Sequence, residues 1–115
     1  MKAFILALLL TLTAAPVLAQ PIPAADAKNH IDKDVTVEGA VSEVHHAASG
    51  RAIFIEIGGR YPNNPFSAVI FKDHFNKFPN VDSLAGKTID VIGHIKEYRG
   101  RPEIILNDPE QIKIK

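Results

Sequence analysis

The feature that most constrains the fold is the stretch Lys87–Asn107, in which two alternating segments flank a tight turn. In its first half apolar and polar residues alternate, and Gly93 interrupts the run, which is typical of a half-buried strand with one bend. The turn at Tyr98–Pro102 contains a glycine, and the extended pattern resumes over 103–106. The stretch therefore predicts a β-hairpin.

Other segments carry strand patterns of different kinds. Residues 51–58 place three isoleucines on one face, so Phe54, on the other face, is expected to point away from the core. Residues 66–71 are apolar almost throughout, as in a strand buried on both faces or wrapped into a barrel. A short tail strand is expected at 111–114.

Two of the predicted strands resemble each other. Residues 33–41 and 87–95 both begin with Lys, alternate apolar residues and carry a glycine at the same place. An extension of the first strand to Val44 would need a bulge. Because the flanking segments do not repeat, we interpret the pair as two bent strands of a small closed barrel.

Short helices are expected at two places. Residues 24–31 follow Pro23, which is tolerated in a first helical turn, and place Ala25 and Ile31 on one face. Residues 73–78 follow the third strand, with Asp73 as the expected N-cap and a proline directly after the helix. The pattern as a whole is all-β with one or two short helices.

This order, three strands, a short helix and two strands, resembles the OB-fold, a five-stranded Greek-key barrel. The residues that carry the resemblance are Val35–Val41 and Val91–Ile104, and it covers 33–114. They are similar to the nucleic-acid-binding branch found in anticodon-binding domains of tRNA synthetases, in exonuclease and helicase accessory domains, and in small exported bacterial proteins with a single OB domain.

In that branch ligands lie across the second and third strands, between the loops that join strands one and two and strands four and five. The resemblance therefore implies binding of single-stranded DNA or RNA, with aromatic side chains for base stacking and cations along the backbone path. It also places His45 and His46 in the first loop. The implied nucleic-acid-binding residues are Arg51, Phe54, Arg60, Tyr61, Lys72, Tyr98, Arg99 and Arg101.

Other readings of these residues stay open. Tyr98 can cover the barrel mouth, Tyr61 can pack on Pro62, and the arginines can serve solubility. The ligand can then be a small molecule or a periplasmic protein. No cluster of acidic residues is apparent on one predicted face, which counts against a cationic ligand. If nucleic acid is bound, changing both Arg99 and Arg101 to glutamate should abolish binding and leave the melting temperature nearly unchanged.

Catalysis, a metal and a cofactor are not expected. The chain has no cysteine and no Gly-x-Ser-x-Gly sequence, and Gly58 and Gly59 lack the Lys-Ser/Thr of a phosphate-binding loop. His45 and His46 are adjacent, so on a strand they would point to opposite faces rather than share a metal. We predict a binding protein rather than an enzyme.

Residues 1–19 have the parts of a secretory signal peptide: Lys2, an apolar run and small residues before Gln20. We expect cleavage before Gln20 and a periplasmic or secreted protein. The mature chain, 20–115, is expected to be a single OB-fold domain and a monomer without membrane contact. The alternative is that the N-terminal segment is retained as a membrane anchor.

Without Lys2 the chain has 13 − 1 = 12 basic and 13 acidic residues, a net charge of −1, which excludes nucleic-acid binding by bulk charge. Residues 51–115, with 10 basic and 8 acidic residues, are the more basic part.

Overall fold

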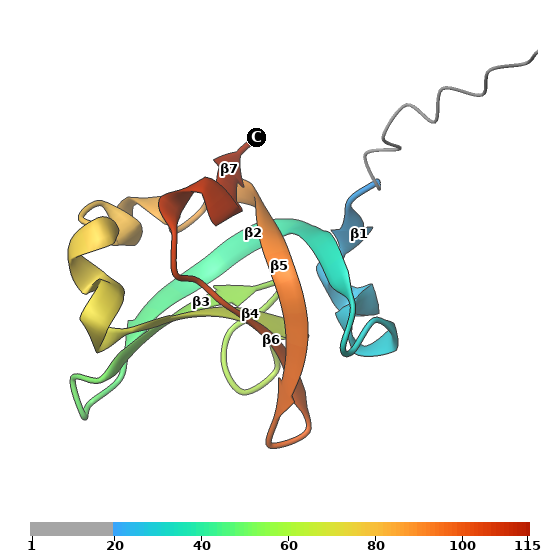
Figure 1. Ribbon diagram of the computed structural model, residues 1–115, viewed down its shortest axis with the longest axis horizontal. Coiled ribbons are helices and arrows are strands. Elements are labelled where there is room, and N and C mark those ends of the chain that lie inside the picture. Colours follow the sequence, from blue (N-terminus) through green and yellow to red (C-terminus); the bar gives the residue numbers. More distant parts are fainter. Residues whose placement is uncertain (1–19) are drawn as a thin grey trace, which may run out of the picture.

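The computed structural model describes residues 20–115, so the expected signal peptide at 1–19 lies outside the described residues. The chain is mostly strand, with short 3-10 helices (η) between strands (Figure 1). In order, the elements are β1 (Ile22–Pro23), η1 (Ala24–Asn29), β2 (Asp34–His46), β3 (Ala52–Ile57), β4 (Phe66–Phe71), η2 (Lys72–Lys77), η3 (Val81–Leu84), β5 (Thr88–Tyr98), β6 (Arg101–Ile105), η4 (Pro109–Gln111) and β7 (Ile112–Ile114).

Five of the strands pair in a closed ring. The antiparallel pairs are β2–β3, β3–β4, β6–β5 and β5–β2, and the ring is completed by parallel pairing of β4 with β6. The predicted count of five is wrong for the whole sheet, which has seven strands. The two additional strands are short and cover free edges: β1 pairs with β2 beside Val37 and Glu38, and β7 pairs with β5 at residues 89–91. Covered edges leave fewer unpaired backbone groups.

The two glycines singled out in the sequence lie where β2 and β5 pair with each other. A Cβ atom on Gly39 would collide with the Ile57 side chain, and one on Gly93 would lie 2.7 Å from Cγ2 of Ile104. Each glycine therefore lets a core isoleucine approach the backbone of a bent strand. The register of β2 against β3 shifts between Val41 and Glu43, so the predicted bulge is confirmed.

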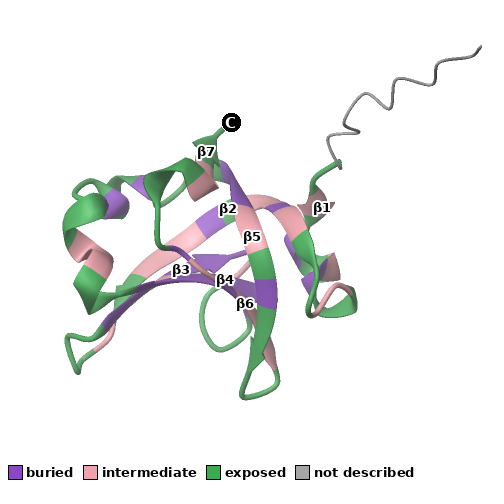
Figure 2. Cartoon of the chain, viewed as in Figure 1, coloured by how far each residue is buried: buried purple, intermediate pink, exposed green. Residues whose placement is uncertain are grey.

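The core fills the inside of this ring (Figure 2). Ile53, Ile55 and Ile57 of β3 are at most 5% exposed and belong to the core, whereas Phe54 is half-buried and lies on the outer face, as predicted. Alternation along the strand explains both placements.

The short helices differ from the expectation. Both are 3-10 helices, and η2 begins after Phe71, with no side-chain cap, so Asp73 is not its N-cap. In η1 the buried residues are Ala24 and Ala27, because residues three apart lie one above the other in a 3-10 helix. Among residues 20–115 no helix has the length and apolar character needed to cross a membrane.

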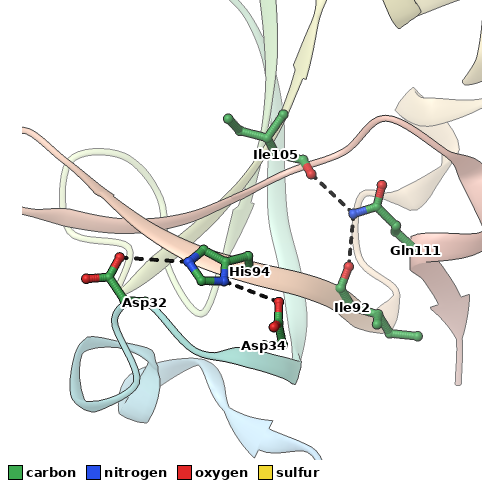
Figure 3. Close-up of polar contacts among 6 residues, drawn as sticks. All are labelled: Asp32, Asp34, Ile92, His94, Ile105 and Gln111. Atoms are coloured by element: carbon green, nitrogen blue, oxygen red, sulfur yellow. Dashed lines mark hydrogen bonds and ion pairs between the residues drawn. The ribbon is translucent and has the colours of Figure 1, made fainter.

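The side chain of Gln111 connects the strands where β5 and β6 separate (Figure 3). Its Nε2 donates to the carbonyl oxygen of Ile92 at 3.0 Å and to that of Ile105 at 3.2 Å, and its Oε1 accepts from the backbone N–H of Asn107 at 2.8 Å. These bonds satisfy backbone groups that the diverging strands leave unpaired.

His94 makes a second connection in the same view. Its Nδ1 lies 3.2 Å from a carboxylate oxygen of Asp34, and its Nε2 lies 3.8 Å from one of Asp32 (Figure 3). Asp34 is the direct cross-strand partner of His94. These exposed contacts join the start of β2 and the residues just before it to β5.

Candidate nucleic-acid interface

A cavity of about 360 Å³ lies on the outer face of the ring. Its floor comes from strands β3, β4 and β6, and its walls come from the β3–β4 loop and the β5–β6 hairpin. In Figure 1 that hairpin and the β2–β3 hairpin project toward the same side of the molecule, the bottom of the view. The lining residues are His45, Phe54, Glu56, Tyr61, Ser67, Tyr98, Arg99, Arg101, Pro102 and Glu103.

A two-residue turn determines where the side chains of the β5–β6 hairpin lie. Arg99 and Gly100 have φ angles of 52° and 76°, and Tyr98 pairs directly with Arg101, which is the pattern of a type I′ turn. Directly paired residues present their side chains on the same face, so Tyr98 and Arg101 both reach the cavity. The guanidinium of Arg99 lies over the Tyr98 ring, 5.2 Å from its centroid.

Arg101 joins this hairpin to the β3–β4 loop. Its Nη2 donates to the side-chain oxygen of Asn64 and, at 3.0 Å, to the Asn64 backbone carbonyl, and its guanidinium lies 4.9 Å from the centroid of the Tyr61 ring. Arg101 is half-buried, whereas Arg99 is exposed. Reversing Arg101 would break these contacts, so the structure argues against the expectation that the double variant keeps its melting temperature.

Glu56 is almost completely buried beneath the cavity, with 1% of its surface exposed. Its Oε2 accepts hydrogen bonds from the Asn64 amide and, at 2.7 Å, from the Ser67 hydroxyl. Burial raises the pKa of Glu56 above its ordinary value, while the Ser67 hydrogen bond and the charge of Arg101 act in the opposite direction.

Glu103 is the second carboxylate of the floor. It is half-buried, and burial raises its pKa, with a further contribution from the negative charge of Glu56 and an opposing one from Lys96. Both carboxylates therefore line one cavity, a pairing that the sequence analysis did not predict. Strand register, which the sequence did not supply, brings these residues together.

The cavity brings together five of the eight predicted site residues: Phe54, Tyr61, Tyr98, Arg99 and Arg101. The other three lie elsewhere. Arg51 and Lys72 are neighbours at the far end of β3 and β4, where the Lys72 N–H donates to the Arg51 carbonyl at 3.0 Å. Arg60 is exposed in the β3–β4 loop and does not line the cavity.

The predicted loop histidines belong to β2, and only His45 lines the cavity, with its ring centroid 6.3 Å from that of Phe54. His46 instead bonds Asp82 of η3 at 2.7 Å. Within residues 20–115 no three His, Asp or Glu side chains are grouped to hold a metal ion.

The sequence analysis did not identify the polar residues of the floor, Glu56, Ser67 and Glu103, or the bridging Asn64. One signal was present: Glu56 shares the outer face of its strand with Phe54, two residues away. Their convergence depends on the pairing of Glu56 with Ser67 and of Ser67 with Glu103.

No protein-family model matches the sequence, and no curated protein matches it. Solved structures match its fold. A proposed aspartyl-tRNA synthetase from Leishmania major Friedlin matches with a TM-score of 0.55 and 15% identity, over 83% of this chain and 20% of that chain. Asparaginyl-tRNA synthetase from Pyrococcus horikoshii gives 0.60 and 20% identity, over 83% and 23%. OBody AM1L10, bound to hen egg-white lysozyme, gives 0.59 and 20% identity, over 84% and 93%.

The chain thus spans 20% and 23% of the two synthetase chains. At such identities the likeness concerns the fold, and the closed pairing of β2, β3, β4, β6 and β5 agrees with it. The chain therefore has an OB-fold.

Proposed function

We propose that this protein is exported and binds single-stranded DNA or RNA in the outer-face cavity. The observation that carries the proposal is the convergence of three aromatic side chains and two arginines on one cavity. Such a site offers flat surfaces for stacked bases and cations for the phosphates. The likeness of fold to two tRNA synthetases supports the proposal at the level of the fold.

The geometry gives the aromatic residues different roles. Tyr61 and Tyr98, with 64% and 53% of their surfaces exposed, present rings at the rim, each already beside a guanidinium. Phe54 lies deeper, beside His45. Each stacked base contributes about 1–3 kcal/mol, so two or three such contacts give useful binding without a high overall charge.

Arg51 and Lys72 are not part of the proposed site. Arg51 directly precedes β3 and Lys72 directly follows β4. Because side chains alternate along a strand, these positions share their side with the core residues Ile53 and Ile70 rather than with the residues of the cavity.

The test is a fluorescence-anisotropy titration of the purified protein with labelled single-stranded DNA and RNA at about 50 and 200 mM salt. We expect saturable binding that weakens as salt rises. Arg99→Asn, which keeps a residue tolerant of positive φ, should reduce the salt slope by about one, whereas Lys113→Gln on β7 should not. Absence of binding at the lower salt would refute the proposal.

One observation favours a second candidate, a small organic ligand. The cavity volume of about 360 Å³ lies within the range of about 300–1,000 Å³ typical of small-molecule pockets. If oligonucleotides fail to bind at low salt, where charge contacts are strongest, this candidate or a periplasmic protein partner takes the place of nucleic acid.

Export is tested separately with the full chain expressed in a bacterial host. The expected result is a periplasmic protein whose mass corresponds to a chain that begins at Gln20. An uncleaved chain in the membrane fraction would instead show that the N-terminal segment is retained as an anchor.

A further inference from the structure

A row of charged and polar side chains crosses the outer face beneath the cavity. Cross-strand pairing aligns Glu43 of β2 with Glu56 of β3, Glu56 with Ser67 of β4, Ser67 with Glu103 of β6, and Glu103 with Lys96 of β5. Paired residues share one face, so this row presents three carboxylates on the face that also bears Phe54. Two of these three carboxylates, Glu56 and Glu103, line the cavity.

Acceptor atoms of these two carboxylates are left free within the cavity. Among residues 20–115, both hydrogen bonds to Glu56 go to Oε2, and Oε1 has no protein donor. Oε1 is not one of the fully enclosed unpaired atoms, which are His74 Nδ1 and Asp90 Oδ1, so it borders the open space of the cavity that Glu56 lines. Glu103 likewise accepts no hydrogen bond from a described residue. These oxygens are therefore available as acceptors for a ligand that brings donors into the cavity.

Positive and negative groups are separated within the cavity. The carboxylates belong to the strands of the floor, whereas Arg99 and Arg101 belong to the hairpin at the rim. Arg101 is held by Asn64 and Tyr61, which fixes its charge there. A ligand that complements both the carboxylates and the arginines has a flat part with hydrogen-bond donors at the floor and an anionic part at the rim. A nucleotide meets this description when its base enters the cavity and its phosphate stays outside.

Resting on the proposed nucleic-acid function, we propose that the cavity selects guanine over thymine and uracil, with Glu103 and the free oxygen of Glu56 as acceptors. Guanine presents two adjacent groups of N–H donors on its pairing edge, which match a carboxylate with two parallel hydrogen bonds. Thymine and uracil present one N–H between two carbonyl oxygens. Those carbonyl oxygens would lie against carboxylate oxygens with no hydrogen between them. A site that contains unpaired acceptors rejects the analogue that lacks the donors.

The test uses the purified protein and two labelled oligonucleotides, oligo(dT) and the same strand with one central dG, which avoids the self-association of guanine runs. We expect the dG strand to bind at least about tenfold more tightly, a usual discrimination for a good bidentate contact. Glu103→Gln should remove most of this preference, because an amide offers one acceptor in place of two, with little effect on oligo(dT). Glu97→Gln, a matched loss of one carboxylate outside the cavity, should retain the preference.

The outcomes separate the two proposals. Equal, salt-dependent binding of both strands by the unaltered protein would overturn guanine selection and leave nucleic-acid binding intact, whereas no binding of either strand at low salt would overturn both. A preference that survives in Glu103→Gln would show that this carboxylate does not read the base. Circular dichroism checks that each variant is folded, and Glu103→Ala replaces the glutamine variant if that one is not.

Discussion

Residues on both faces of β3 and β4 are buried, but by different means. On the inner face isoleucines pack into one core, and Ile55 and Ile70 are fully buried. On the outer face Glu56 and Ser67 are 1% and 9% exposed, but they are covered by a loop and a hairpin and paired through Asn64. Burial beneath a loop, where hydrogen bonds are available, therefore permits polar groups that an apolar core would exclude.

The largest effect is expected on the inner face. Ile55→Ala should lower the free energy of unfolding by about 2–5 kcal/mol, because it leaves a cavity in a core that cannot collapse fully around it. Chemical denaturation of both proteins measures this loss. A loss below that range would mean that the two faces contribute more equally than their packing indicates.

The next effect concerns the bridge of the outer face. Asn64→Ala should cost about 1–3 kcal/mol, because it removes a donor from buried Glu56 and an acceptor from Arg101. Asn63→Ala, on the exposed neighbour in the same loop, is the matched control and should change little. Equal denaturation midpoints for Asn64→Ala and the unaltered protein would show that the bridge does not stabilise the fold.

A smaller stability effect is expected for Phe54, the outward neighbour of Ile55. Because the ring is half-buried, Phe54→Ala should cost about 1–2 kcal/mol of stability, less than the 3–5 kcal/mol usual for a core phenylalanine. Oligonucleotide binding should weaken by about 1–3 kcal/mol through loss of stacking. Denaturation and anisotropy on the same sample test both, and a core-sized loss of stability would contradict the outward placement.

The sequence predicted the inner face better than the outer one for a physical reason. Periodicity identifies the core side of a strand, and it located 66–71 and the outward Phe54 correctly. The edge strand β1 was not anticipated, since two residues carry no periodicity. The two short helices were located close to their observed places, but the cap and the buried face were not predicted correctly, because propensity hardly distinguishes a single 3-10 turn from an α-helical one.

The candidate site depended on information that periodicity does not contain. The aromatic and basic residues of the hairpin could be listed from their turn, but the sequence did not separate exposed Arg99 from half-buried Arg101. That difference arises from Asn64, which lies 37 positions before Arg101 in the chain. The acidic floor likewise joins Glu56 and Glu103 through the register of three strands. Long-range pairing therefore determines the chemistry of the outer face.

The smallest expected effect is a pH dependence of stability specific to the outer face. Because the pKa of Glu56 is raised above its ordinary value of 4.5, the folded protein binds the proton more tightly than the unfolded chain does. Its contribution to stability should therefore be greatest below pH 4.5 and decline as pH rises through the folded-state pKa. The pKa values of Asp26 and Glu38 are lowered, so the stability that these two carboxylates contribute is lost as pH falls. This loss occurs below their ordinary pKa values, at a more acidic pH than the change expected for Glu56.

Glu56→Gln tests this contribution, because Asp26 and Glu38 remain in both proteins. The variant also removes the negative charge that helps to raise the pKa of Glu103, and this change acts on the difference in the same direction. The difference in unfolding free energy, unaltered protein minus variant, should fall as pH rises above 4.5, as measured by urea denaturation at several pH values. A difference that instead grows with pH would mean that the charge of Arg101 outweighs burial and that the carboxylate is stabilised in its ionised form. Glu56 and Arg101 would then form a structural ion pair. The outer face would differ from the apolar inner face in how it is stabilised, but not in having polar groups available to a ligand.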